Sequence, residues 1–350
     1  MNLKELSKIL NLSQTTVSRA LNGYPEVSEA TRNRVNAAAR KYHYIPNTRA
    51  QGLATGRTHA VGHVIPMSTK HEVVNPVFTD FVAGASEVYS RENYDMHLTI
   101  VPDTGEEHAY RKIAAKGSVD GVIVHGPVKN DPRINLLKTI GMPFVVHGRS
   151  KGDDSNDYTW VDMNNIRAFE RATQFLIDLG HKRIALLNGL IGMDFADRRL
   201  TGHLKALKAN GIPEDKALCF SDEMTEDYGY VATMTAMQQG NPPTAFLASS
   251  IIVGIGIRRA CSELGLTFGK EVSLIVHDDE LSYFRNGTTE PIYTATRSSV
   301  RQAGHICAQL LMDQIADPTL PPRHVLLEAE LIIGNTTGPA PQTPNAPKPS

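Results

Sequence analysis

The sequence predicts an α/β protein in which an all-α N-terminal headpiece precedes a larger, two-lobed core of doubly wound parallel sheets. Three observations predict this class. Apolar residues recur at helical spacing through residues 3–41, and from residue 60 onward short apolar strand-like runs alternate with amphipathic helices. The chain has 350 residues, of which 41% are hydrophobic, so it is long enough for two or three domains with substantial cores.

The first 41 residues predict three short helices joined by tight turns. Apolar side chains that share one helical face predict the first helix over residues 3–10: Leu3, Leu6, Ile9 and Leu10. Only Asn11-Leu12 separates it from the second helix, and Asn tolerates the left-handed backbone that such a turn needs. Ser13 caps the second helix, and Ser28 caps a third helix that continues to about Lys41.

The second helix has one apolar side and one polar side. Val17, Ala20 and Leu21 lie on the inner side, and the outer side carries Gln14, Thr15, Ser18 and Arg19. Amide, hydroxyl and guanidinium groups hydrogen-bond to base edges in the DNA major groove. The pattern predicts a helix-turn-helix whose second helix reads DNA, although the corner of an ordinary helical domain has the same pattern.

Charge is distributed unevenly along the chain, although the formal net charge is −1. Residues 1–57 hold nine basic and three acidic side chains, which leaves 27 basic and 34 acidic side chains for the rest. A basic headpiece on an acidic body is typical of a polyanion-binding module joined to a domain for a neutral ligand. Chance clustering on a solvated surface is the alternative.

No feature of the sequence predicts a membrane or secreted protein. Cys219, Cys261 and Cys307 lie far apart and outside any metal-ligand spacing, so we expect reduced thiols. No apolar run approaches the roughly 20 residues that cross a bilayer. Lys4-Glu5 stand where a signal peptide needs its apolar segment, so we expect a cytoplasmic protein without a membrane partner.

A short helix is expected at residues 48–54, between the headpiece and the core. A helix of about seven residues is marginal in water, and Gly52 costs about a further 1 kcal/mol relative to Ala. We therefore expect this segment to order only when something holds it. Leu53 has no apolar stripe of its own to join.

From residue 60 the chain alternates between strands and helices. The strand-like runs are residues 60–66, 95–101, 119–125, 143–147, 183–188, 244–248 and 272–277. Amphipathic helices between them include residues 77–91, 164–180, 197–210, 225–239 and 251–265. Open parallel sheets of this kind bind ligands in the crevice beyond the carboxyl ends of their strands. Five prolines after Thr336 predict a disordered tail over residues 339–350.

Motifs for catalysis or for a bound cofactor are missing from the sequence. Gly254-Ile255-Gly256 resembles part of a dinucleotide fingerprint, but the preceding strand ends near Ala248, so these glycines fall inside a helix. There is no P-loop and no Gly-x-Ser-x-Gly elbow, and the histidines lack metal-ligand spacing. We expect no cofactor, no metal and no catalytic residue.

Polar residues recur just past several of the predicted strands: His147-Gly148-Arg149, Asp194 with Arg199, Ser249-Ser250, and Asp278-Asp279. Each alone is ordinary for a turn or a helix cap. Together they place carboxylates, guanidinium groups and hydroxyls at one edge of the predicted sheets. That combination suits a polyhydroxylated ligand.

The first 60 residues resemble the lac-repressor (LacI/GalR) family of bacterial transcriptional regulators. Three stretches carry the resemblance: Leu-Ser-x-Thr-Thr-Val-Ser-Arg-Ala-Leu-Asn-Gly at 12–23, Val-Ser-Glu-Ala-Thr-Arg-x-Arg-Val at 27–35, and Tyr-Ile-Pro-Asn with Gln-Gly-Leu-Ala-Thr-Gly-Arg-Thr at 44–58. The resemblance continues more loosely to about residue 338, through Asn75-Pro76-Val77-Phe78, residues 180–185, Arg199-Leu200-Thr201-Gly202 and His277-Asp278-Asp279.

The resemblance implies a periplasmic-binding-protein-like core with three crossings between its lobes. The headpiece and hinge helix then occupy residues 1–57, with the hinge at about 47–55, and the core occupies residues 58–338. The N-lobe comprises about 58–161 and 291–318, and the C-lobe about 162–290 and 322–338. The crossings fall near Val161, Glu290 and Asp317–Pro322.

The resemblance also implies roles for individual residues. Bases are read by Gln14, Thr15, Ser18 and Arg19, and the DNA backbone is contacted by Lys4, Ser13, Thr16, Asn22 and Arg32. The minor groove is contacted by Asn47, Ala50 and Leu53, with Leu53 as a wedge. The effector is bound by Phe78, His147, Arg149, Arg199, Ser249 and Asp278, of which Arg199 and Asp278 form the anchoring pair.

The implied protein is a homodimer that binds a pseudo-palindromic operator as a repressor of carbohydrate genes, under control of a sugar-like effector. Ser249-Ser250 replaces the Asn-Asp frequent in the family, and His147-Gly148-Arg149 stands where an Asp often follows the strand. We therefore expect a specialised pocket, for a disaccharide or other glycoside. The rival interpretation is a sugar-binding receptor or a sugar-metabolising α/β enzyme with an incidental helical N-terminus. The sequence shows neither the export signal nor the catalytic pair that these would need.

Overall fold

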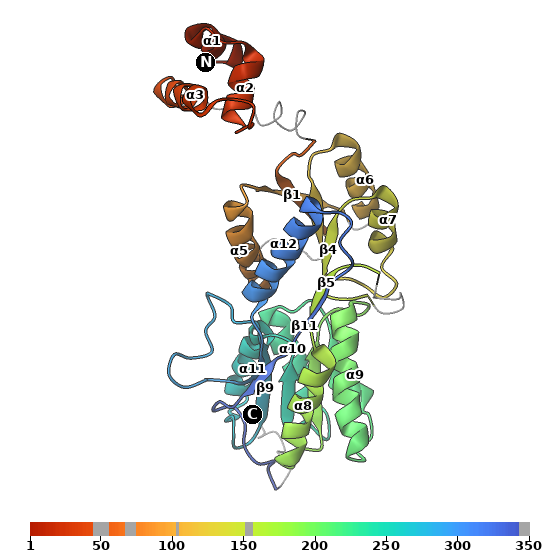
Figure 1. Ribbon diagram of the computed structural model, residues 1–350. Helices are drawn as coiled ribbons and strands as arrows, with labels where there is room; N and C mark the ends of the chain where they lie inside the picture. The colour runs from red at the N-terminus through yellow and green to blue at the C-terminus, as the bar shows by residue number, and fades with distance from the viewer. Residues whose placement is uncertain (45–55, 67–74, 103–104, 151–156, 343–350) are drawn as a thin grey trace. The chain divides into compact units, whose positions relative to one another are not determined.

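The computed structural model describes residues 1–44, 56–66, 75–102, 105–150 and 157–342. The chain divides into two compact units, Met1–His59 and Ala60–Ser350, which are described separately (Figure 1). The predicted hinge contacts Asn47, Ala50 and Leu53 lie outside the described residues, as does the predicted tail from residue 343 onward.

The first unit folds around α1 (Leu3–Leu10), α2 (Gln14–Leu21) and α3 (Glu29–Lys41), as the sequence predicts. The Ser13 and Ser28 hydroxyls accept from the first turns of α2 and α3, and Asn11 turns the chain between α1 and α2 with a φ of 52°. Apolar side chains from all three helices form the core of this unit: Leu6, Leu10, Val17, Ala20, Val27, Val35 and Ala39. The opposite side of α2 is therefore left to polar side chains.

The second unit contains two six-stranded sheets. The N-lobe sheet has the order β11-β5-β4-β3-β1-β2, formed by β11 (His324–Leu327), β5 (Trp160–Met163), β4 (Phe144–His147), β3 (Gly121–His125), β1 (Ala60–Pro66) and β2 (Asp95–Val101). The C-lobe sheet has the order β12-β10-β9-β8-β6-β7, formed by β12 (Glu330–Ile332), β10 (Thr294–Arg297), β9 (Ser273–Asp278), β8 (Ala245–Ala248), β6 (Ile184–Asn188) and β7 (Cys219–Ser221). All neighbours are parallel except β10 and β12. The predicted two-lobed, doubly wound α/β core is confirmed.

Each sheet has helices on both faces. In the N-lobe, α5 (Pro76–Arg91) and α12 (Val300–Ala316) lie side by side on one face, and α6 (Glu106–Lys116) and α7 (Pro132–Ile140) cover the other (Figure 1). In the C-lobe, α8 (Asn165–Asp178) packs beside α9 (Asp194–Ala209), and α10 (Glu226–Met237) beside α11 (Ile251–Glu263). Successive strand residues serve opposite faces: Leu186 packs with α8, and Leu187 packs with α10 and α11.

Two of the three crossings between the lobes come later than the sequence analysis expects. The crossings follow β5, β10 and β11, at residues 163–165, 297–300 and 327–330; the first agrees with the prediction near Val161, and the other two come after the predicted Glu290 and Asp317–Pro322. β10 reads Thr-Ala-Thr-Arg, which is not an apolar run, and β11 reads His-Val-Leu-Leu, in which the apolar stretch has only three residues. These two strands, like β5, β7 and β12, have only three or four residues, so their patterns are too short to predict a strand from the sequence.

The segment after β12 is held by the C-lobe sheet further than the predicted tail allows. Thr336 is buried, and its hydroxyl donates to the Leu274 carbonyl at 2.7 Å. The amide of Ala340 donates to the Leu179 carbonyl at 2.8 Å. One side-chain hydroxyl and one backbone amide, rather than apolar burial, fix these residues, so composition alone does not reveal them.

Gly254 and Gly256 lie inside α11, as the sequence predicts, and serve helix packing. A Cβ atom on Gly256 would lie 1.9 Å from the Glu226 carbonyl oxygen of α10, and one on Gly254 would lie 2.5 Å from Val276 Cγ1. The glycines therefore allow α11 to approach α10 and β9 closely. They form no phosphate-binding turn.

Candidate functional site

The exposed face of α2 carries the residues predicted to read bases. Gln14, Thr15 and Arg19 are exposed, and Ser18 is half-buried. Within the described residues, the Arg19 guanidinium has neither a hydrogen bond nor an ion pair, so all its donors are available. A guanidinium presented in this way can donate two parallel hydrogen bonds to one guanine edge.

The residues predicted to contact the DNA backbone differ in how far they are already engaged. Lys4 is exposed, Ser13 caps α2 through Thr16, and Asn22 donates to Ser18 Oγ at 3.5 Å. Arg32 has a structural role that the sequence did not predict. Its Nη2 atom donates to the carbonyls of Tyr24 and Val27 at 3.1 and 3.2 Å, which fixes the loop between α2 and α3.

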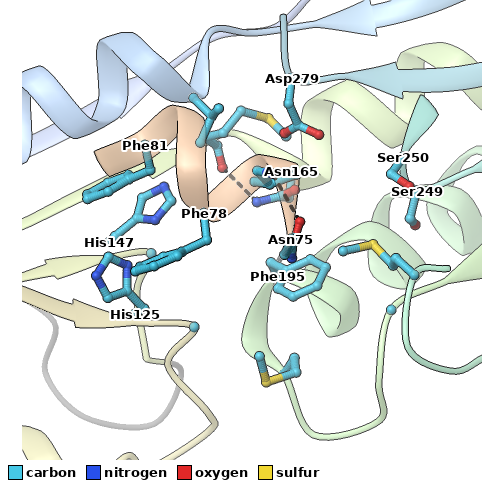
Figure 2. A pocket seen from close by; sticks show the side chains of 18 of the residues that line it. Asn75, Phe78, Phe81, His125, His147, Asn165, Phe195, Ser249, Ser250 and Asp279 are labelled. Atoms are coloured by element: carbon cyan, nitrogen blue, oxygen red, sulfur yellow. Dashed lines mark hydrogen bonds between the residues drawn. The ribbon is translucent and has the colours of Figure 1, made fainter. Parts of the chain in front are cut away.

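A cavity of about 410 Å³ is lined by residues of both lobes. Figure 2 shows Phe78, Phe81, His125 and His147 on one side, and Asp279, Ser249 and Ser250 on the other. The predicted effector residues that line it are Phe78, His147, Arg149, Arg199 and Ser249. These residues come from helices and strand ends that are far apart in the sequence, and the fold gathers them around one cavity.

Arg199 projects from α9 and is held rigidly in the wall of the cavity. Its Nε donates to Asn165 Oδ1 at 2.7 Å, and its Nη1 donates to the Ser249 carbonyl at 2.6 Å. The guanidinium lies over the rings of Phe169 and Phe195, at 4.9 and 5.0 Å from their centroids. Burial lowers the pKa of Arg199 to about 10, against the opposing effect of nearby carboxylates, so it stays charged at neutral pH.

Asp279, and not the predicted Asp278, lines the described part of the cavity. Successive residues at the end of β9 point to opposite sides, so only one of the two carboxylates can face the ligand. Asp278 turns back to accept from the amide of Glu280 at 2.9 Å. Asp279 Oδ1 lies 3.3 Å from His277 Nε2. Burial alone would raise the pKa of Asp279, but the nearby His277, Arg199 and His147 hold it below the usual value.

Arg149 is already paired within the cavity wall. Its Nε donates to Asp162 Oδ2 at 2.8 Å, and its guanidinium lies 4.9 Å from the centroid of the Trp160 ring. Burial raises the pKa of Asp162, and the bond to Arg149 opposes that rise. This pair leaves little net charge for a ligand to meet on the N-lobe side.

Two histidines and two phenylalanines form the other wall, with His63 behind them. His147 lies against Phe81 with ring centroids 4.5 Å apart, and His125 lies 5.3 Å from the Phe78 centroid. Burial lowers the pKa of His147 to about 4, although Asp279 opposes the shift, and burial lowers the pKa of His63 behind them to about 4 as well. The wall is therefore aromatic and uncharged at neutral pH.

Two contacts link the lobes on either side of the cavity. Asp80 of α5 accepts from both the amide and the hydroxyl of Ser282 in the C-lobe, the amide at 2.8 Å. The loop after β3 meets the start of α9, where the Asp194 amide donates to the Pro127 carbonyl at 3.0 Å. The contact between Asp80 and Ser282 is called the lobe latch below.

Sequence reasoning placed Asp279 at the predicted crevice but assigned the effector contact to Asp278, and it missed Asn165, Phe81, His125 and His63. The only feature of the sequence that could have identified them is their position, since most lie in the first turns of helices or at strand ends. Polar residues are common at such positions, so position alone does not indicate a ligand contact. The described residues contain no group of three or more His, Cys, Asp or Glu side chains that could hold a metal ion. None of the described helices has the length and apolar character needed for a membrane crossing.

Comparison with known proteins finds a matching family for each of the two parts of the chain. Residues 2–47 match the family described as bacterial regulatory proteins, lacI family, and residues 173–337 match the periplasmic binding protein-like domain. The chain is similar to the HTH-type transcriptional regulator AglR of Rhizobium meliloti (strain 1021), with 43% identity over 352 residues, which is 100% of this chain and 98% of that protein.

Solved structures share the same fold. A transcriptional regulator CelR–cellobiose complex is 27% identical and has a TM-score of 0.71, over 96% of this chain and 99% of that one. The lac repressor dimer bound to operator and the anti-inducer ONPF is 23% identical, with a TM-score of 0.82 over 97% of this chain and 99% of that one. The second likeness shows the fold alone.

Proposed function

This chain belongs to the lacI family of bacterial regulatory proteins and is a DNA-binding transcriptional regulator, and on that premise we propose that a sugar or glycoside bound between its lobes controls its binding to operator DNA. The observation that carries the proposal is a cavity that Arg199 and Asp279 line together with an uncharged aromatic wall. The regulated genes are then those of carbohydrate use, with the chain as their repressor.

The unpaired ends of Arg199 and Asp279 support a polyhydroxylated ligand. Arg199 uses Nε and Nη1 for protein contacts, and its Nη2 makes no hydrogen bond to a described residue. Asp279 uses one carboxylate oxygen for His277 and leaves the other without a described partner. A donor and an acceptor so placed suit neighbouring hydroxyl groups, which both donate and accept.

The charge balance and the aromatic wall support an uncharged sugar. Arg199 and Arg149 each have a carboxylate nearby, and the pKa values of His63 and His147 are too low for either to be charged at neutral pH. Phe78 offers a flat apolar ring to the apolar face of a sugar. The similar CelR–cellobiose complex supports a disaccharide within this class.

Exposed apolar side chains support a homodimer. Met96, Leu98 and Ile100 of the edge strand β2 are 37, 39 and 49% exposed, and their spacing of two places them on one face. A second copy of the chain suits this face, because paired headpieces read the two half-sites of a pseudo-palindromic operator. Leu98→Glu should then convert dimer to monomer in sedimentation velocity, and an unchanged dimer would place the interface elsewhere.

Switching requires a ligand that favours one arrangement of the lobes. A sugar held by Phe78 from the N-lobe and by Arg199 and Asp279 from the C-lobe would favour one lobe angle, which is the hinge-closure mode. We propose that this angle sets whether Asn47, Ala50 and Leu53 of two chains can pair in the minor groove, with Leu53 as the wedge. The effector can shift this balance only by its differential affinity for the two states.

The rival functions are a sugar-binding receptor and a sugar-metabolising enzyme. We propose that the chain has no catalytic activity, because the family that it belongs to consists of transcriptional regulators. Neither rival accounts for the unpaired polar face of α2. A gel shift with the intergenic DNA beside its own gene separates them, since neither rival binds that DNA specifically.

The effector proposal is tested by adding sugars in two assays, a thermal unfolding measurement and the gel shift. Cellobiose and other disaccharides should raise the melting temperature of the full chain, because a ligand of the folded state stabilises it. The same sugar should change the gel shift with the intergenic DNA. A sugar that raises the melting temperature without changing DNA binding would contradict control by this pocket.

A further inference from the structure

A chain of three hydrogen-bonded side chains, Tyr89, His63 and His125, runs from the N-lobe interior to the cavity. The Tyr89 hydroxyl lies 3.0 Å from His63 Nε2, and His63 Nδ1 lies 2.9 Å from His125 Nε2. Tyr89 and His63 are buried, whereas His125 lines the cavity beside Phe78 (Figure 2). Neither Tyr89 nor His63 takes part in the ligand contacts described above.

Strand register brings the two histidines together. His63 of β1 pairs with Ile123 of β3, and His125 lies two residues further along β3, so both side chains project from the same face of the sheet. The helix α5 covers this face and supplies Tyr89. The two imidazole rings stack with centroids 5.2 Å apart and an interplanar angle of 23°.

All three side chains are neutral at neutral pH. Burial lowers the pKa of His63 to about 4, and burial together with the nearby His63, His147 and Arg133 lowers the pKa of His125 well below its usual value. Burial raises the pKa of Tyr89 far above its usual value. Each neutral imidazole carries one N–H, so the chain has one hydroxyl hydrogen and two ring hydrogens to place.

Only two arrangements of these hydrogens satisfy both hydrogen bonds. In the first, Tyr89 donates to His63 Nε2, His63 donates from Nδ1 to His125 Nε2, and His125 carries its hydrogen on Nδ1. In the second, His125 donates from Nε2 to His63, and His63 donates from Nε2 to the Tyr89 oxygen. The Tyr89 hydroxyl hydrogen would then need another acceptor.

The surroundings of Tyr89 decide between the two arrangements. Among the described residues the Tyr89 hydroxyl has no hydrogen-bond partner other than His63, and its side chain is 2% exposed. The second arrangement therefore leaves a buried donor unsatisfied, which is unfavourable. In the first arrangement every buried donor has an acceptor. His125 Nδ1 makes no hydrogen bond to a described residue and remains available at the cavity.

We propose that Tyr89 and His63 are positioning residues that hold His125 as its Nδ1–H tautomer, so that the N-lobe wall presents a fixed hydrogen-bond donor to the ligand. The ligand atom opposite His125 is then an acceptor, such as a hydroxyl, ring or glycosidic oxygen. A ligand with an N–H group at this place would meet a second donor and bind more weakly. The ligand class rests on the proposed function, but the tautomer does not.

The tautomer is tested on the full chain without ligand, labelled with 15N in its histidines. Two-bond 1H–15N spectra distinguish an Nδ1–H from an Nε2–H imidazole, and the resonances that disappear in His125→Asn assign His125. We expect Nδ1–H in the unmodified protein and a mixture of both forms in Tyr89→Phe. Tyr110→Phe is the matched control, because it also removes a buried hydroxyl but one without a partner among the described residues. An Nε2–H form of His125 in the unmodified protein would overturn the proposal.

The ligand arm uses calorimetric titration with a disaccharide that raises the melting temperature, starting with cellobiose. Tyr89→Phe should lower its affinity by about three- to tenfold, which is the size of one net hydrogen bond, while Tyr110→Phe keeps the unmodified affinity. Equal affinities in Tyr89→Phe and the unmodified protein would overturn the role of the donor in binding. If His125 shows the Nδ1–H form but no disaccharide binds, the proposed effector class fails and the tautomer assignment stands.

Discussion

The two functional regions of this chain are built in opposite ways. The reading face of α2 consists of neighbouring residues on one helix, and Gln14, Thr15 and Arg19 extend into solvent. The cavity is assembled from both lobes, where Arg199 is buried and Asp279 half-buried, and both already have partners in the protein. The difference shows that DNA reading needs little more than a stable helix, whereas ligand recognition needs the whole core to be folded. Four experiments test this difference between the two regions.

Lowering the pH should produce the largest difference between the two regions, because it should destabilise the core far more than the headpiece. Burial lowers the pKa of His63, His147 and His203 from 6.5 to about 4, and the headpiece has no buried histidine among its described residues. Between pH 6.5 and 4 the unfolded chain binds protons that the folded core excludes. The free energy of unfolding of the core therefore has its full value above pH 6.5. It falls as the pH drops toward 4, by several kcal/mol in total for these histidines.

The single tryptophan, Trp160, lies in β5, so its fluorescence reports the core. We expect the melting temperature by this signal to fall steeply below pH 6.5. His203→Asn should flatten that dependence, because it removes one buried histidine, and His305→Asn should leave it as it is, because the His305 side chain is 42% exposed. The same slope in both variants and the unmodified protein would show that other groups cause the acid sensitivity.

Arg199→Ala should greatly weaken ligand binding without changing the affinity for operator DNA. It removes the charged contact to the ligand and leaves Asn165 and the Ser249 carbonyl without their buried partner. Charged hydrogen bonds contribute about 1.5–3 kcal/mol each, so we expect at least about a tenfold loss of affinity for the disaccharide. Calorimetry measures the affinity, and a gel shift without ligand checks DNA binding.

The control is Lys205→Ala on the same helix, because Lys205 pairs with Glu170 at the surface, 61% exposed. Surface pairs of this kind contribute little. Loss of operator binding by ligand-free Arg199→Ala, with its fold intact, would contradict the separation of the two regions.

Arg19→Ala should have the converse effect. Removing a bidentate base contact costs about 1–3 kcal/mol of operator affinity and relaxes the preference at one position of each half-site. Ligand affinity of the core should not change. The comparison variant is Lys4→Ala, which should weaken binding to operator and random DNA alike if it meets phosphate. Equal losses on both DNAs for Arg19→Ala would remove it from the base-reading set.

The same contrast explains what could be read from the sequence. In the headpiece, spacing and caps alone predict α1, α2, α3 and the polar face, because helix periodicity and capping are local signals. In the core, periodicity predicts the buried strands β1, β6 and β9 but not β10 or β11, whose place depends on pairing with distant segments. The resemblance implies Asp278 and not Asp279, and the sequence cannot distinguish the two because the direction of a side chain at a strand end depends on where the strand begins to turn. Arg32 was expected at DNA, and its contacts to the loop carbonyls follow only from the tertiary fold.

The lobe latch should show the smallest effect, and it tests whether the cavity depends on the relative arrangement of the lobes. Asp80 and Ser282 join the helix that carries Phe78 to the loop that follows Asp279, so they favour the arrangement in which both walls face one ligand. Ser282→Ala removes the hydroxyl donor and keeps the amide bond to Asp80. One such hydrogen bond is worth about 1 kcal/mol, so we expect a two- to fivefold weaker disaccharide affinity by calorimetry. Ser86→Ala is the matched control, because Ser86 lies on the same helix as Asp80 and its hydroxyl bonds only within that helix. Tighter ligand binding in Ser282→Ala would mean that the latch opposes the ligand-bound arrangement, and an unchanged affinity would mean that the lobes are held together without it.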